Sequence, residues 1–150
     1  MKKFENVQEV LDFAIAREQE AHDFYEDLSE RMATPQMVKV FKGFAIEELG
    51  HKMKLQAIKG GEIEVDTEEV HGLKIADYVV DVKPQSDMTY ADVLLVAMNR
   101  EKAAFRLYCD LAELMQNNEL RDIFLVLAQE EAKHKLRFEI EYDDEVLIED

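Results

Sequence analysis

Apolar residues recur at helical spacing in four long segments of the chain, and short stretches rich in glycine, asparagine or acidic residues separate these segments. Spacings of three and four residues place the apolar side chains on one face of a helix. No convincing alternation with a period of two residues marks a β-strand. The pattern therefore predicts an all-α protein, a four-helix bundle built around one core.

The predicted first hairpin covers about residues 6–60. Its first helix should begin after Asn6, which together with Glu9 resembles a capping box. Its second helix should begin at Thr34–Pro35, because proline is favoured at the first helical position. The pair Gly60–Gly61 should end this second helix.

The predicted second hairpin covers about residues 89–142, with its turn at Asn117–Asn118. Residues 61–88 form a long acidic crossover connection, in which we expect a short helix near residues 73–80. This connection lets the chain travel back along the bundle before the second hairpin starts. The acidic tail after residue 142 is expected to fray. We therefore predict a single domain over residues 1–150, a four-helix bundle of two hairpins with a long crossover connection.

The second hairpin repeats the first at an interval of 83 residues. The segment AREQEAHDFYEDLSERM, residues 16–32, aligns with NREKAAFRLYCDLAELM, residues 99–115. The identities include Glu18 with Glu101 and Tyr25 with Tyr108. The chain therefore contains an internally duplicated helical hairpin.

Each of the four apolar stripes contains a glutamate near its centre, and two stripes add a histidine one turn later. The six residues are Glu18, Glu48, His51, Glu101, Glu131 and His134. In an antiparallel hairpin, residues equally distant from the turn lie at the same height. Each glutamate is 15 residues from its turn, about 22 Å along the helix. We therefore expect all four carboxylates at one level.

Four buried carboxylates cannot remain ionised together without compensation, because burial and like charges both raise the pKa of a carboxyl group. Two divalent cations would balance the four negative charges, and two histidines would add neutral nitrogen donors. Glutamates from two helices and Glu-x-x-His from two others are the ligand set of di-iron and di-manganese bundles. Oxygen and imidazole donors suit iron or manganese, and the lack of thiolates argues against structural zinc.

The Glu-x-x-His motif alone is weak evidence for a metal site. Glu68 and His71 in the connection match it too, but they lack the repeat, the apolar stripe and a facing glutamate. The metal hypothesis depends on six positions that agree in periodicity, in the repeat and in distance from the turns. The alternative is that these helix faces are solvated.

Two tyrosines and two further glutamates accompany the predicted ligands. Tyr25 and Tyr108 lie two turns beyond Glu18 and Glu101 on the same faces, and helical side chains lean toward the N-terminus. Each hydroxyl could therefore hydrogen-bond a metal ligand, or each tyrosine could simply fill the core. The glutamates that precede two of the ligands are expected in solvent; they are Glu47 and Glu130.

The composition of the chain restricts the classes of partner that it can bind and the cellular compartment in which it is expected. The 150 residues are 47% hydrophobic and 35% charged, with a formal net charge of −16. Such an acidic chain should bind neither nucleic acid nor an acidic membrane surface, and cations are its natural small partners. Cys109 is the single cysteine, so no internal disulfide can form, which fits a reducing cytosol. Without a signal peptide or a membrane-spanning segment, a cytoplasmic protein is predicted.

The segments EQEAHDFY, EELGH, EKAAFRLY and EEAKH resemble the rubrerythrin branch of the ferritin-like superfamily. The resemblance covers essentially all four helices. It implies a di-iron centre held by the six residues named above, with Glu48 and Glu131 bridging the metals or chelating one each. It also implies reduction of hydrogen peroxide or reaction with dioxygen, in a homodimer.

The chain departs from typical rubrerythrins in two respects. It lacks the C-terminal rubredoxin domain with its CxxC pairs, so an external electron donor, such as a rubredoxin-like carrier, would have to supply electrons. It also has Ala104 where those proteins have an additional ligand glutamate. The implied ligand set is therefore more symmetric than that of typical rubrerythrins.

Four functions are consistent with the sequence. The leading hypothesis is a di-iron oxidoreductase. The alternatives are a ferritin-like protein for iron oxidation, storage or delivery, a di-manganese catalase-like enzyme, and a metal-free helical interaction module. The expected cofactor is two iron ions, and the alternative cofactors are two manganese ions or a mixed iron–manganese pair.

Overall fold

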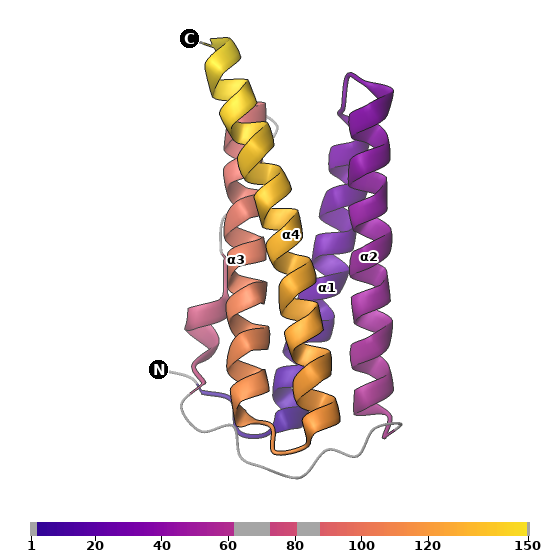
Figure 1. Ribbon diagram of the computed structural model, residues 1–150, viewed down its shortest axis with the longest axis vertical. Coiled ribbons are helices and arrows are strands. Elements are labelled where there is room, and N and C mark those ends of the chain that lie inside the picture. Colours follow the sequence, from indigo (N-terminus) through magenta and orange to yellow (C-terminus); the bar gives the residue numbers. More distant parts are fainter. Residues whose placement is uncertain (1–2, 62–72, 81–87, 150) are drawn as a thin grey trace. The chain divides into compact units, whose positions relative to one another are not determined.

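The computed structural model describes residues 3–61, 73–80 and 88–149, and in these residues it is almost entirely helical (Figure 1). The elements are α1 (Val7–Glu30), α2 (Pro35–Lys59), the short 3-10 helix η1 (Ile75–Tyr78), α3 (Tyr90–Leu114) and α4 (Asn118–Glu149). Within the described residues, the β contact is an isolated antiparallel bridge between Lys3 and Lys74. The predicted all-α class is confirmed.

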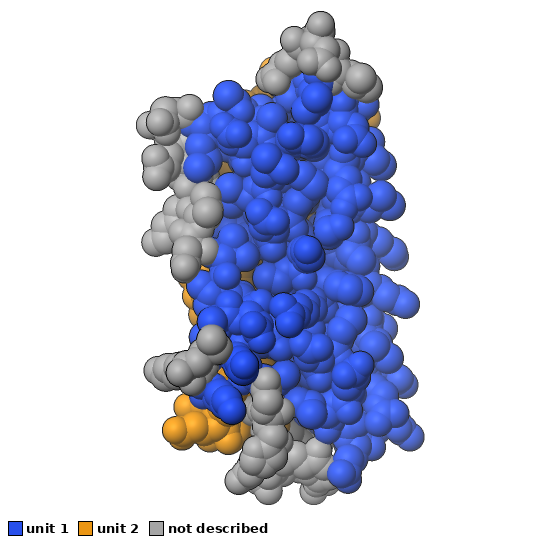
Figure 2. Space-filling view, turned by 90° about the vertical axis from the view of Figure 1, so that its left-hand side faces the viewer, with its two compact units in different colours: residues 1–3, 72–150 blue, residues 4–71 orange. Residues whose placement is uncertain are grey.

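The chain divides into two compact units, which Figure 2 colours separately. Unit 2 consists of Phe4–His71 and contains the α1–α2 hairpin. Unit 1 consists of Met1–Lys3 and Gly72–Asp150 and contains η1 and the α3–α4 hairpin. Each unit thus corresponds to one of the two predicted hairpins, and the expectation of a single domain stays a prediction.

The predicted caps of the first hairpin are confirmed, with one difference. The Asn6 side chain accepts a hydrogen bond from the Glu9 backbone N–H at 2.9 Å. The Glu9 carboxylate accepts a hydrogen bond from the backbone N–H of Glu5 at 2.8 Å. In a standard capping box it would accept from the backbone N–H of the N-cap residue itself, here Asn6. At the far end of α2, Gly61 has a φ of 89°, a left-handed conformation that favours glycine.

The second hairpin is also capped by its own side chains. Thr89 and Asp92 form a reciprocal capping box at the start of α3. At the turn into α4, the Asn117 side-chain oxygen accepts from the backbone N–H groups of Glu119 at 2.8 Å and Leu120 at 3.3 Å. These caps fix where each helix starts, and therefore how high each core residue lies.

The predicted end of the last helix, near residue 142, is wrong, because α4 continues to Glu149. The segment beyond Tyr142 contains neither glycine nor proline, so nothing local ends the helix. Glu145 and Val146 are only half exposed, and this partial burial supports the additional turns.

The predicted helix in the connection is present as η1, and its tyrosine, Tyr78, attaches it to α3. The Tyr78 hydroxyl donates a hydrogen bond of 2.6 Å to the Asp110 carboxylate. The Arg106 guanidinium lies 5.9 Å from the centre of the Tyr78 ring. Burial and the hydrogen bond to Asp110 both raise the pKa of Tyr78. Most of the connection, including His71, lies outside the described residues.

The predicted apolar stripes form the buried faces of the helices. Their members with at most 2% exposure include Leu11, Ala14, Tyr25, Phe41, Ala45, Leu94, Ala97, Tyr108, Phe124 and Phe138. Aromatic pairs link the helices of each unit. Tyr25 of α1 meets Phe44 of α2 edge to face at 5.8 Å, and Tyr108 of α3 stacks on Phe124 of α4 at 6.3 Å.

Replacing Tyr78 by phenylalanine should lower the free energy of unfolding by about 1–2 kcal/mol, because the change removes a hydrogen bond to a carboxylate. Urea unfolding at pH 7 measures this. Because the pKa of Tyr78 is raised in the folded state, its contribution is complete below the unfolded pKa of about 10 and declines above that pH. Tyr142→Phe is the control, with an expected change below about 0.5 kcal/mol. Equal losses from both variants would contradict this account.

Candidate metal centre

Unit 2 brings together three of the predicted ligands: Glu18 from α1 and Glu48 and His51 from α2. A spacing of three residues places Glu48 and His51 on the same face of α2. His51 Nδ1 lies 3.6 Å from Glu18 Oε2 and 3.8 Å from Glu48 Oε1. Each of the three residues offers one ligand atom, and these atoms lie within 4.8 Å of one another. We call these three residues the unit 2 half-site.

Unit 1 contains the matching set: Glu101 from α3 and Glu131 and His134 from α4. His134 Nδ1 lies 3.6 Å from Glu101 Oε1, the same separation as the corresponding pair in unit 2. One ligand atom from each residue again lies within 4.8 Å of the others. We call these three residues the unit 1 half-site. The residues that repeat in the sequence therefore also have the same side-chain arrangement in the two hairpins.

All six side chains are deeply buried. The glutamates are at most 2% exposed, and the histidines are 5% or less exposed. Carboxylates at such depth lose their hydration, and in protein interiors they are found paired, neutralised or coordinating a metal. The two carboxylates of each half-site therefore need a neutralising charge, which a proton or a bound cation can supply.

A divalent cation fits each half-site in distance, charge and donor type. Separations of 3.6 and 3.8 Å are too long for hydrogen bonds. Two donors bound to one ion at about 2.1 Å would lie roughly 3–4 Å apart, which matches. Two carboxylates balance one divalent charge, and oxygen with imidazole nitrogen is a donor set that suits iron or manganese.

Each histidine presents the nitrogen that such a site requires. Nδ1 of His51 and Nδ1 of His134 are the atoms that face the carboxylates. A ring that binds a metal through Nδ1 carries its proton on Nε2, so the neutral form of the ring suffices. The histidines thus add donors without adding charge.

Of the residues expected around the ligands, the two tyrosines are buried as predicted. Tyr25 and Tyr108 are each 1% exposed and pack against aromatic rings of the facing helix. Hydrogen bonds from their hydroxyls to the predicted ligands stay a prediction. Ala104 is half buried, and Glu47 is exposed, as predicted, whereas Glu130 is partly covered.

A contact that the sequence analysis missed lies beside the unit 2 half-site. His22 Nδ1 is 2.8 Å from the backbone oxygen of Ala45, one helical turn before Glu48. The rule that pairs Glu18 with Glu48 across the turn also pairs His22 with Ala45 within one residue, so it could have indicated this contact. The Lys52 ammonium also donates to the Gln19 side chain at 2.6 Å. Both contacts hold α1 and α2 in register at the height of the ligands.

Cys109 belongs to the packing of unit 1. Its side chain is partly buried, and burial together with the nearby Asp110 and Glu113 raises the pKa of its thiol. The thiol form is therefore favoured over the reactive thiolate. Cys109 is therefore suited to packing rather than to thiol chemistry.

Comparison with known proteins identifies the family of the fold and of the site. The family model described as Rubrerythrin matches residues 9–142. A Thermotoga maritima protein, described as a ferritin-like diiron-carboxylate protein, is 22% identical, with a TM-score of 0.82 over 97% of this chain and 99% of that chain. A hypothetical protein from Pyrococcus furiosus is 24% identical, with a TM-score of 0.72 over 91% and 87%. No curated protein matches.

These likenesses give the fold as a ferritin-like four-helix bundle, and they confirm that predicted class. Among the described helices, none combines the length and the apolar character that crossing a membrane requires.

Addition of Mn²⁺ at about 100 times its dissociation constant should raise the melting temperature by roughly 10–20 °C, because two ions bind the folded state alone. Differential scanning calorimetry measures the shift. Glu48→Gln should reduce it by at least half, since the change removes a ligand charge without removing volume. Glu47→Gln, one residue earlier and exposed, is the matched control and should keep the full shift. Equal shifts in the two variants would exclude Glu48 as a ligand.

Proposed function

The chain belongs to the rubrerythrin family, and from this premise we propose that its two half-sites together hold two iron ions in a di-iron oxidoreductase. The proposed oxidants are hydrogen peroxide and dioxygen. The observation that carries the proposal is the recurrence of one buried Glu–Glu–His triad in each hairpin. If these helix faces were solvated, the triad residues would not have to be buried, and the same triad would not have to recur in both hairpins.

The four glutamates set the charge of the proposed centre. Together they carry four negative charges, which two divalent ions balance, while the histidines stay neutral. Two bound ferrous ions would supply the two electrons that reduction of one peroxide molecule requires. With Ala104 in place of a further carboxylate, each half-site would offer a metal ion the same donors, two carboxylates and one imidazole.

The protein around the half-sites would exclude water and hold the ligands still. Buried apolar residues precede and follow the ligands along each stripe, and Tyr25 and Tyr108 are buried on the same stripes. The contact of His22 with Ala45 fixes the relative height of Glu18 and Glu48. Ligands held in this way need little reorganisation when the charge of the centre changes. We also expect the two tyrosine hydroxyls to donate hydrogen bonds to ligand carboxylates.

Reducing equivalents would come from another protein. A chain with Cys109 as its single cysteine cannot form a rubredoxin site, which needs CxxC pairs. We therefore propose an external electron donor, such as a rubredoxin-like carrier. The single thiol and the family also favour a cytoplasmic location.

A single-turnover reaction tests this function. Protein loaded anaerobically with two Fe²⁺ per chain is mixed with one equivalent of H₂O₂, and the iron is followed by stopped-flow absorbance and Mössbauer spectroscopy. We expect both ions to become ferric while one peroxide and two protons yield two waters. A reductant should then restore the ferrous protein. Glu48→Gln should lose at least about tenfold in rate, and Glu47→Gln should match the wild type.

Other outcomes would identify the alternatives. Iron that is oxidised no faster than free Fe²⁺ in the same buffer would contradict an oxidoreductase. Ferric iron that leaves the site and collects in large particles, seen by light scattering, would indicate iron storage or handling. Oxygen release from peroxide by the manganese-loaded protein without a reductant would indicate a catalase-like enzyme.

A further inference from the structure

We propose that the two half-sites bind metal unequally, so that the unit 2 half-site takes the first divalent cation and holds it more tightly than the unit 1 half-site. This inference rests on the metal centre proposed above and concerns the residues around the ligands. The ligands themselves are of the same types in both units. The interval of 83 residues also pairs each neighbouring position of one unit with a position of the other, so the two surroundings can be compared residue by residue.

The charges within one helical turn of the ligand glutamates differ between the units. Apart from the ligands, the three residues on either side of Glu18 and Glu48 give a net charge of −1, and the same count around Glu101 and Glu131 gives +2. A divalent cation is attracted less strongly where the neighbouring charges are positive. Three exchanges from unit 2 to unit 1 cause the difference, and they are Gln19 to Lys102, Glu20 to Ala103 and Gly50 to Lys133.

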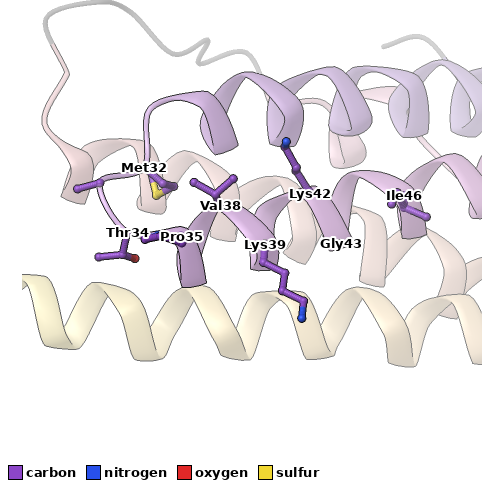
Figure 3. Close-up of a pocket in the computed structure, with 9 residues that line it drawn as sticks. Met32, Thr34, Pro35, Val38, Lys39, Lys42, Gly43 and Ile46 are labelled. Carbon is purple, nitrogen blue, oxygen red and sulfur yellow. The ribbon is translucent and has the colours of Figure 1, made fainter.

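The difference persists when more distant residues are counted. Figure 3 shows two lysines of α2, Lys39 and Lys42, beside a groove that Val38 and Ile46 also line. A count over nine residues on either side of each ligand glutamate includes both lysines, and it gives −2 in unit 2 and +1 in unit 1. The lysines of α2 therefore do not cancel the advantage of unit 2, because α1 is strongly acidic over the same range.

A difference of three charges is enough to separate the two binding steps. At about 10 Å from a divalent ion, roughly the width of a helix, each unit charge changes the binding constant about two- to threefold at low ionic strength, even with the dielectric constant of water. Three such charges change it at least about tenfold. Lys102 and Lys133 are exposed, so salt should screen their effect.

A hydrogen bond between helices favours the same half-site. The ring of His22 donates from Nδ1 to the backbone oxygen of Ala45 at 2.8 Å, one turn before Glu48. The equivalent positions of unit 1 are Phe105 and Ala128, and a phenylalanine side chain has no donor. This bond holds α1 and α2 in register before a metal ion arrives. A preorganised set of ligands loses less freedom on binding, so the ion is held more tightly.

A second contact between the helices follows the same pattern. In unit 2 the Lys52 ammonium donates to the Gln19 side chain at 2.6 Å. Unit 1 has lysines at both equivalent positions, Lys102 and Lys135. Two ammonium groups are both donors and repel each other, and Lys135 pairs instead with Glu139 of its own helix. Charge and the contacts between helices thus agree in favouring unit 2.

Ordered loading would make the proposed reaction depend on the weaker half-site. A chain with one ferrous ion, in unit 2, holds one of the two electrons that reduction of one peroxide molecule requires. Protons would then neutralise the carboxylates of the unit 1 half-site. Full reactivity would therefore follow the filling of the unit 1 half-site, and the supply of metal would limit the protein at this triad.

Calorimetric titration of the metal-free full chain with Mn²⁺, at about 10 mM ionic strength, tests the inference. We expect two steps of one ion each, with dissociation constants that differ at least about tenfold. Glu101→Gln should abolish the weaker step and keep the tighter one, whereas Glu18→Gln should abolish the tighter step. In about 0.5 M NaCl the ratio of the two constants should fall at least about threefold, because salt screens the exposed lysines.

An exchange of residues between the units tests the electrostatic cause. The double variant Gln19→Lys with Lys102→Gln moves one charge from unit 1 to unit 2, and it should narrow the ratio of the two constants at least about threefold at unchanged composition. Gln116→Lys is the control, because it adds an exposed charge 15 residues from Glu101. It should change either constant less than about twofold.

A second exchange tests the contribution of the histidine. His22→Phe should weaken only the tighter step, by about threefold or more. Phe105→His places a donor at the equivalent position of unit 1, and it should strengthen only the weaker step. Circular dichroism should show equal helix content in all variants, so that a change in either step reflects the half-site and not loss of the fold.

Several results would overturn the inference. They are two steps of equal affinity, a single step for both ions, loss of the tighter step in Glu101→Gln, and an unchanged ratio in the exchange of Gln19 with Lys102. Absence of Mn²⁺ binding would contradict the metal centre itself. Failure of the inference can therefore be distinguished from failure of the proposed function.

Discussion

The interior of each hairpin contains carboxylates that cannot stay there alone. An ionised glutamate at most 2% exposed has lost nearly all contact with water, and four such residues occupy the four long helices. Burying a charge without a partner costs more free energy than any single packing contact returns. The arrangement is stable when the charge of each triad is neutralised, by protons in the absence of metal or by a bound cation. A divalent cation supplies the neutralising charge in a way that also uses the histidine nitrogen.

The rest of the fold can be understood as support for this arrangement. A triad that spans two helices requires the helices to keep a fixed relative height. Side-chain caps at Asn6, Thr34, Thr89 and Asn117 determine where the helices start. Beside the unit 2 half-site, the contact from His22 to α2 adds a restraint between the helices. The capping residues in the sequence thus help to determine the distances between the ligand atoms in the core.

Most of the fold was predictable because its signals are local. The caps indicated the helix starts, the glycine pair indicated the end of α2, and hairpin symmetry placed Glu18 level with Glu48. What the sequence could not supply depends on tertiary surroundings. The final turns of α4 exist although no cap signals them, since Glu145 and Val146 are partly buried. The hydrogen bond from Tyr78 to Asp110 joins residues far apart in the chain, so no local sequence pattern predicts it.

The central claim, that each buried triad exists to bind a divalent cation, is tested most directly by calorimetric titration of the metal-free protein with Mn²⁺. Titration in two buffers of different ionisation enthalpy counts both the ions bound and the protons released. The account predicts two ions per chain and proton release on binding, because the ligands must give up the protons that neutralise them without metal. Absence of binding, or binding that releases no protons and survives replacement of Glu18 and Glu101 by glutamine, would contradict it.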